Sequence, residues 1–172
     1  MERIAEADLP EADEAGISAL LARCFEGFGG RSHYLIRHDW RHVIREEGGI
    51  IAHLAVQLRA MRLGGRLITV AGIADVATDP DHRGKGHAAK LLRDAIAQAG
   101  QARAEFVLLF GTARIYAAAG FRPVANPIIW VAMPGAVTGE IRRAPAEALM
   151  VLPLQGTAWD EAAELDLLGP LF

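Results

Sequence analysis

Asp79-Pro80-Asp81-His82-Arg83-Gly84-Lys85-Gly86-His87-Ala88 is the stretch of this chain that decides its fold. It follows a strand-like run over 68–78 and precedes a segment in which apolar residues recur at helical spacing, namely Ala88, Leu91, Leu92, Ala95, Ile96 and Ala99. The first N–H groups of a helix have no partner inside the helix, and the helix dipole adds partial positive charge there. Glycines let an anion approach such a backbone closely. The stretch therefore predicts a phosphate-binding turn, with the candidate residues Arg83, Gly84, Lys85, Gly86, His87 and Ala88.

A basic loop that closes an ordinary strand–helix connection is the alternative interpretation, because short glycine motifs are common. The sequence argues against two other kinds of glycine-rich nucleotide-binding motif. The sequence contains no G-x-x-x-x-G-K-[ST], which argues against a P-loop NTPase. It also contains no G-x-G-x-x-G with an acidic residue at dinucleotide spacing, which argues against NAD binding.

The order of elements around this turn resembles the GNAT superfamily, whose members transfer acyl groups from acetyl-CoA or a related acyl-CoA. The family fingerprint Q/R-x-x-G-x-G/A follows the fourth strand, and residues 81–86 match both of its glycines. Asp81 stands where the family usually has Gln or Arg. The resemblance implies acetyl-CoA, or another acyl-CoA, as co-substrate.

A second family feature is a strand, a short helix that carries a tyrosine, and then Gly-Phe. The strand is matched by Phe106–Phe110, the helix by residues 112–119 with Tyr116, and the dipeptide by Gly120-Phe121. Thr112 is the expected N-cap of this helix, and the glycine is its expected left-handed C-cap.

Three further segments are similar to aminoglycoside 2'-N-acetyltransferases and to the nodulation N-acyltransferases that modify chitooligosaccharides. They are residues 49–56, the Gly64-Gly65 turn and the strand over 149–154. This likeness implies that the acceptor is a primary amine of a small molecule, and points to an amino sugar.

Length and composition limit the other functions. With 172 residues we expect one domain over 1–172, long enough to bury a real core. No apolar run reaches the length of a membrane span, and the N-terminal segment lacks a signal-peptide core, so we expect a cytoplasmic protein that does not contact membranes. The net charge of −3 gives no support to nucleic-acid binding. Cys24 is the single cysteine, and the scattered histidines lack metal-ligand spacing, so we expect no metal site.

The patterning along the chain predicts an α+β fold, with a mixed, mostly antiparallel central sheet and helices on both faces. A first helix is expected within 10–26, and a loop or short helix over 27–39. The expected strands are 41–46, 50–63, 66–78, 106–110, 124–133 and 149–154, with a Gly64-Gly65 hairpin turn between the second and third. Loops are expected over 134–145 and 156–172.

The resemblance also implies roles in acyl transfer, which requires a deprotonated amine, a polarised thioester carbonyl and a protonated leaving thiolate. Val76, Ala77 and Thr78 fall where the fourth strand exposes backbone groups to the cofactor, and the N–H of Val76 would polarise the carbonyl. Tyr116 falls where the family places a proton donor to the cofactor sulfur. The alternatives are that these residues only form a core strand and a packing contact.

Asp75 is the acidic residue nearest to that strand segment and is therefore the candidate base. The related aminoglycoside enzymes carry Glu one position earlier, where this chain has Ala74. Successive strand residues point to opposite faces unless a bulge intervenes. A hydrogen-bonded or solvated carboxylate without a catalytic role is the alternative for Asp75.

Two other functions fit the same motifs. One is a transferase that takes a longer acyl chain, and the other is a CoA-binding sensor module that does not turn over. Homodimerisation is an expectation carried over from the superfamily.

Overall fold

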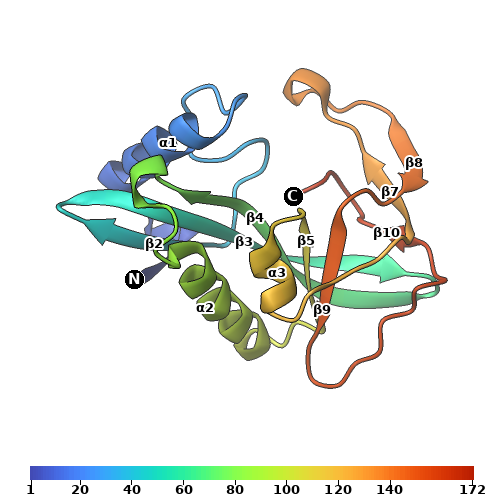
Figure 1. The fold of residues 1–172 in the computed structure, drawn as a ribbon. Helices are drawn as coiled ribbons and strands as arrows, with labels where there is room; N and C mark the ends of the chain where they lie inside the picture. The colour runs from blue at the N-terminus through green and yellow to red at the C-terminus, as the bar shows by residue number, and fades with distance from the viewer. The chain divides into compact units, whose positions relative to one another are not determined.

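A long hairpin runs through the computed structural model, which describes residues 1–172. Its strands are β3 (Gly49–Leu63) and β4 (Arg66–Thr78), joined at the predicted Gly64-Gly65 turn (Figure 1). Gly64 has a φ of +56°, which glycine adopts without a steric penalty. The hairpin contributes to two units: unit 1 comprises residues 1–57 and 73–97, and unit 2 comprises 58–72 and 98–172.

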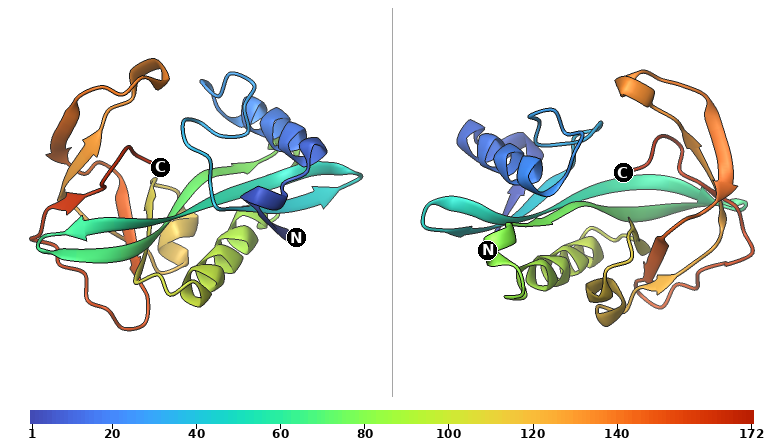
Figure 2. Two further views of the ribbon diagram at one scale, coloured as in Figure 1. Left: turned by 180° about the vertical axis from the view of Figure 1, so that it is seen from behind. Right: turned by 45° about the horizontal axis from the view of Figure 1, so that its top comes forward.

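Unit 1 is a sheet with a helix on each face. β1 (Glu2–Ala5) pairs antiparallel with β2 (Trp40–Glu46), which pairs antiparallel with β3. Figure 2 shows α1 (Glu11–Cys24, blue) on one face and α2 (His87–Gln101, yellow-green) on the other. Two 3₁₀ turns, η1 (Glu6–Asp8) and η2 (Pro80–His82), complete the unit. One of its apolar clusters joins α1 to the strands through Ile17, Leu20, Leu21, Phe28, Val43, Ile50 and Ala77.

Arg41 in β2 is completely buried in unit 1. Its guanidinium connects separate segments of the unit through hydrogen bonds. Its Nε and Nη2 donate to the two carboxylate oxygens of Glu6 at 2.7 and 3.1 Å, and its Nη1 donates to the Ser32 carbonyl at 2.6 Å. Arg37 also donates to Glu6, at 2.7 Å. Burial raises the pKa of Glu6, but the hydrogen bonds and charges of Arg41 and Arg37 outweigh it and lower the pKa overall.

Unit 2 adds β5 (Phe106–Phe110), α3 (Arg114–Ala118), β6 (Arg122–Pro123), β7 (Pro127–Val131), η3 (Pro134–Ala136), β8 (Ile141–Pro145), β9 (Leu149–Pro153) and β10 (Leu165–Asp166). Its strand order is β6-β9-β5-β4-β3-β10-β7-β8. β10 runs parallel to β7, whereas the pairs β5–β9, β6–β9, β7–β8 and β3–β10 are antiparallel. The prediction of an α+β fold with a mixed, mostly antiparallel sheet is thus confirmed. No helix is both long enough and apolar enough to cross a bilayer.

Several segments differ from the sequence prediction, which did not include the short strands β1 and β6. The expected loop over 134–145 contains η3 and β8, whose residues are largely exposed and lack the apolar alternation of a half-buried strand. The expected loop over 156–172 contains the two-residue β10, which is too short to leave a pattern. The strand expected over 124–133 begins only at Pro127, because proline has no N–H and is tolerated at the first position of a strand.

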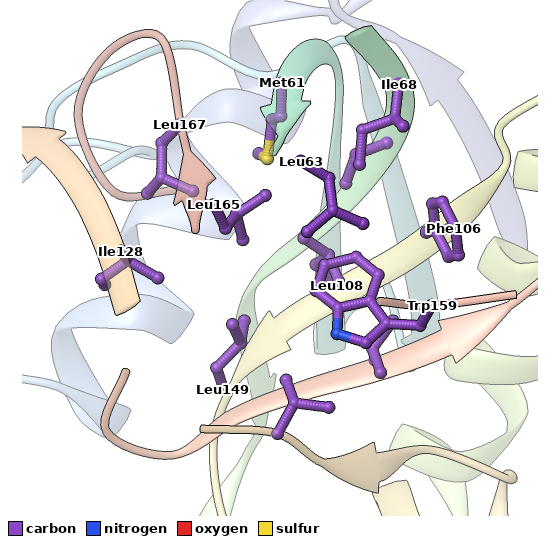
Figure 3. Packing of buried hydrophobic residues seen from close by; sticks show 13 residues of the cluster. Met61, Leu63, Ile68, Phe106, Leu108, Ile128, Leu149, Trp159, Leu165 and Leu167 are labelled. Carbon is purple, nitrogen blue, oxygen red and sulfur yellow. The ribbon is translucent and has the colours of Figure 1, made fainter. Parts of the chain in front are cut away.

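The core of unit 2 includes Trp159, which comes from a segment without regular structure (Figure 3). Its ring meets Phe106 edge to face, with 5.0 Å between the ring centroids. The fully buried Asn126 accepts the indole N–H through Oδ1 at 2.9 Å. Its Nδ2 donates to the carbonyls of Asp160 and Ala163 at 2.8 and 2.7 Å. Asn126 therefore holds the segment that carries the tryptophan.

We expect Asn126→Ala to lower the free energy of unfolding by about 3 kcal/mol, because it leaves a buried indole N–H and two carbonyls without their partner. Urea unfolding followed by tryptophan fluorescence measures this loss. Arg142→Ala removes only the exposed ion pair with Glu140 and should change stability by less than about 0.5 kcal/mol. Equal effects of the two substitutions would contradict the structural role of Asn126.

Glu6 makes the stability of unit 1 depend on pH. Because its pKa is lower in the folded state than the usual 4.5, its ionised form contributes stability that is present above the unfolded pKa and lost as pH falls through the folded pKa. Glu6→Gln should cost about 3 kcal/mol at neutral pH, since Arg41 then lacks its counter-charge. The difference between variant and wild type should shrink below pH 4.5. Urea midpoints measured from pH 3 to 7 test this, and a constant difference would be evidence against it.

Candidate active site

The predicted phosphate turn connects the end of β4 to the start of α2 in unit 1 (Figure 1). Gly84 and Gly86 have φ values of +77° and +78°, and a Cβ at either position would meet no atom within 4 Å. Residues 83–86 are exposed. The space in front of these glycines is therefore open, as an approaching anion requires.

The first turn of α2 has no acceptor of its own for its free N–H groups. The helix hydrogen bonds begin with Lys90 N–H donating to the Gly86 carbonyl at 3.0 Å. Gly86 precedes the helix and has no side chain to cap it, and the first turn contains no acidic residue. The N–H groups and the positive end of the helix dipole thus remain available to a ligand. This is the arrangement that binds phosphate at helix N-termini.

The turn is anchored at its N-terminal end by Asp79. The Asp79 backbone N–H donates to the Ile51 carbonyl at 2.8 Å, and its carboxylate accepts from the Asp81 N–H and from Arg23. The hydrogen bond from the Asp81 N–H, followed by those from Arg23, lowers the pKa of Asp79. Arg83 Nε donates to the Thr78 carbonyl at 3.3 Å. These contacts give Asp79 a structural role and fix the turn relative to β4.

Residues 76–78 form the end of β4, directly before the turn. Ala77 is buried in the core beside α1, while Val76 and Thr78 are half-buried. The Thr78 carbonyl also accepts from Cys24 Sγ at 3.5 Å. Residues 76–88, which contain every predicted cofactor-binding residue, therefore form one continuous stretch of unit 1.

Asp75 interrupts β4 with a left-handed backbone. Its φ is +51°, a conformation that is uncommon for a non-glycine residue inside a strand. The backbone carbonyl accepts from His53 Nδ1 at 2.9 Å, and the carboxylate Oδ2 lies 2.9 Å from His38 Nε2. The positive φ shows that β4 departs from regular strand geometry at this residue. The contact with His38 could not be predicted, because it joins positions 37 residues apart with no local pattern.

His53 is a neutral core histidine, as its apolar strand indicates. Burial, followed by the positive charge of Arg41, lowers the pKa of His53 to about 3. Its Nδ1–H donates to Asp75, so its Nε2 is the acceptor that faces Arg41 Nη1 at 3.5 Å. Across residues 1–172, no group of three or more His, Cys, Asp or Glu side chains is arranged to hold a metal ion.

Tyr116 lies in α3 of unit 2, and the turn that ends this helix positions it. The N–H groups of Phe121 and Gly120 donate to the carbonyls of Tyr116 and Ala117 at 3.1 and 3.0 Å, which is the Schellman pattern. Gly120 has the predicted left-handed φ, +95°. Thr112 is not the N-cap, because the helix begins at Arg114 after Ala113 and no side chain caps it.

The Tyr116 ring packs closely on the backbone at the end of β5. A Cβ at Gly111 would lie 2.8 Å from its Cε2 atom, so only glycine leaves room for the ring. Burial raises the pKa of the Tyr116 phenol. The phenol is therefore protonated at neutral pH and can act as a proton donor.

The chain matches the model of the acetyltransferase (GNAT) domain over residues 7–124. Comparison with curated proteins gave no match. Among solved structures, the GNAT family N-acetyltransferase YhbS from Escherichia coli in complex with CoA is 20% identical with a TM-score of 0.65, over 96% of this chain and 88% of that one.

Two other solved structures share the fold. A GNAT family acetyltransferase from Brucella melitensis in complex with acetyl-CoA is 17% identical with a TM-score of 0.59, over 94% of this chain and 93% of that one. Eis1 from Mycobacterium abscessus is 12% identical with a TM-score of 0.62, over 75% of this chain and 34% of that one. The domain match covers well over half of the 172 residues. The chain therefore belongs to the GNAT acetyltransferase family.

Proposed function

We propose that the protein transfers the acetyl group of acetyl-CoA directly to a primary amine of a small molecule, within a ternary complex. The observation that carries this proposal is the uncapped N-terminus of α2, with Gly84 and Gly86 open in front of it. Such a site suits the pyrophosphate of CoA. The CoA and acetyl-CoA complexes of the two similar GNAT structures support the same co-substrate.

The acceptor is proposed to be an amino sugar, on the resemblance of three segments to enzymes that acylate such amines. In this proposal the backbone N–H of Val76 polarises the thioester carbonyl, and Tyr116 donates a proton to the departing sulfur. Asp75, directly before Val76 on β4, is the acidic residue that takes part in deprotonating the amine. The protonated phenol of Tyr116 supports the role of donor.

Turnover with a panel of amines tests the proposal as a whole. Acetyl-CoA is incubated with the protein and with glucosamine, an aminoglycoside, a polyamine or an arylalkylamine, and acylated products are detected by mass spectrometry. An acetylated amino sugar is the expected product. Binding of CoA without turnover of any amine would favour a sensor module, and turnover only with longer acyl-CoA donors would overturn the acetyl assignment.

Gly86→Asp should raise the Kd of CoA at least a hundredfold from a value of about 1 µM, which corresponds to about −8 kcal/mol. The new carboxylate would cap the free N–H groups of α2 and repel phosphate. Gly135→Asp is the matched control, because Gly135 also has a positive φ, +59°, with nothing within 4 Å of a Cβ. Calorimetric titration of the folded variants provides the measurement. Unchanged affinity in Gly86→Asp would remove the cofactor site from this turn.

Tyr116→Phe should lower kcat by about ten- to a thousandfold while leaving the Kd of CoA nearly unchanged. The substitution keeps the ring against Gly111 and removes only the hydroxyl. Steady-state kinetics and a CoA titration on the same preparation separate the two effects. If kcat stays at the wild-type value, Tyr116 has only a packing role.

A further inference from the structure

We propose that His38 is the general base that takes the proton from the acceptor amine, and that Asp75 is the residue that positions it. The inference rests on the proposed function and names a residue within it. Both residues lie in unit 1, and Asp75 directly precedes the strand segment 76–78. Their side chains meet at 2.9 Å, between His38 Nε2 and Asp75 Oδ2.

This contact decides which nitrogen of His38 carries the proton. A carboxylate only accepts hydrogen bonds, so the neutral imidazole must place its proton on Nε2. The lone pair is then on Nδ1, which can accept a proton. When Nδ1 is protonated, the negative charge of Asp75 stabilises the imidazolium, as the carboxylate does in a catalytic triad.

His38 Nδ1 is buried and has no hydrogen-bond partner within the protein. The residue as a whole is only 8% exposed. Burying a polar atom without a partner is unfavourable, so such atoms are rare and call for an explanation. An acceptor nitrogen whose natural partner is a substrate N–H provides one. The left-handed backbone of Asp75 is a second sign of function, because strained conformations of this kind cluster at active sites.

The loop that carries His38 is held firmly in place. The Asp39 N–H donates to the Val56 carbonyl at 2.9 Å, and Gln57 Nε2 donates to the Arg37 carbonyl at 3.4 Å. The Arg37 side chain pairs with Glu6 and Glu14. His38 is therefore fixed from both sides along the chain, as a base within a preformed site requires.

The step balances in atoms and electrons. The lone pair of the amine nitrogen forms a bond to the thioester carbonyl carbon, and the C–S bond breaks with its electron pair leaving on sulfur. The proton that the nitrogen loses goes to His38 Nδ1. The sulfur takes its proton from Tyr116, as proposed above, and the proton on His38 passes to solvent after product release.

His38 interacts electrostatically with His33, on the same loop, and with His53 on β3. The neighbouring Arg37 and the buried ion pair of Arg41 and Glu6 are further charged groups in this part of unit 1. Burial, then the charges of Arg37, Arg41 and His38, lower the pKa of His33. Because His53 is neutral at the pH of an assay, Asp75 supplies the negative charge in contact with the His38 ring.

His38→Gln tests the proposal, because the amide of Gln can still donate to Asp75 but cannot take up a proton. We expect kcat/KM for the best amine of the panel to fall by about a hundred- to a thousandfold at neutral pH. The Kd of acetyl-CoA should stay within about twofold, and the acidic limb of the pH profile of kcat/KM should disappear. Asp75→Asn should lower kcat/KM by a smaller factor, about tenfold, and shift that limb without abolishing it.

His42→Gln is the matched control. His42 is also fully buried in unit 1 and also contacts an aspartate, with 2.8 Å between its Nδ1 and Asp94 Oδ2. We expect this substitution to reduce thermal stability while the pH profile keeps both limbs. If His38→Gln and His42→Gln have the same effect on the profile, His38 is a structural residue and the proposal fails.

The outcomes for His38 and for the proposed function can be told apart. If the wild-type protein does not bind acetyl-CoA or turns over no amine, the proposed function is contradicted. Wild-type turnover that persists with an unchanged pH profile in His38→Gln contradicts only the role of His38. If His38→Gln does not fold, ¹⁵N NMR of the histidine rings in the wild-type protein decides. A proton on Nε2 with a free Nδ1 supports the proposal, and a proton on Nδ1 overturns it.

Discussion

The buried positive charge of Arg41 is the constraint on which the geometry of unit 1 depends. A guanidinium without access to water is tolerated only when its charge and its N–H groups are satisfied within the protein. Arg41 meets this requirement with both carboxylate oxygens of Glu6, the Ser32 carbonyl and the Nε2 atom of His53. These partners come from η1, from the loop before β2 and from β3. Satisfying one charge therefore fixes three separate parts of the chain.

The same charge extends its effect to the strand that leads into the phosphate turn. Burial and the charge of Arg41 keep His53 neutral, so the ring carries a single proton. Its Nε2 faces Arg41 Nη1 as an acceptor, and its Nδ1–H donates to the Asp75 carbonyl. That hydrogen bond helps to offset the left-handed backbone of Asp75, which no neighbouring glycine relieves. The carboxylate of Asp75 in turn contacts His38. A structural ion pair and a candidate proton relay are thus successive parts of one polar network.

The elements whose pattern is local can be predicted from the sequence. The 3.6-residue period of 88–99, the glycine pair at 64–65 and the apolar runs at 106–110 and 149–154 all mark structure at their own positions. The strands β1, β6, β8 and β10 were missed because their pairing partners, and not their own residues, make them strands. Thr112 was wrong as a cap because the helix begins two residues later, at Arg114. The contact between His38 and Asp75 was beyond prediction, since the two residues lie 37 positions apart and no local pattern relates them.

This difference between local and long-range determinants also explains why the sequence indicates the co-substrate more clearly than the acceptor. A phosphate is bound by consecutive backbone N–H groups, so the residues that bind it must be neighbours in the chain, and they leave a motif. A base for an amine is a single side chain whose protonation is set by partners from other elements. Here those partners are contributed by β3, β4 and the loop before β2. The glycine turn can therefore be recognised in the sequence, whereas the residues on the acceptor side come from separate segments and leave no motif.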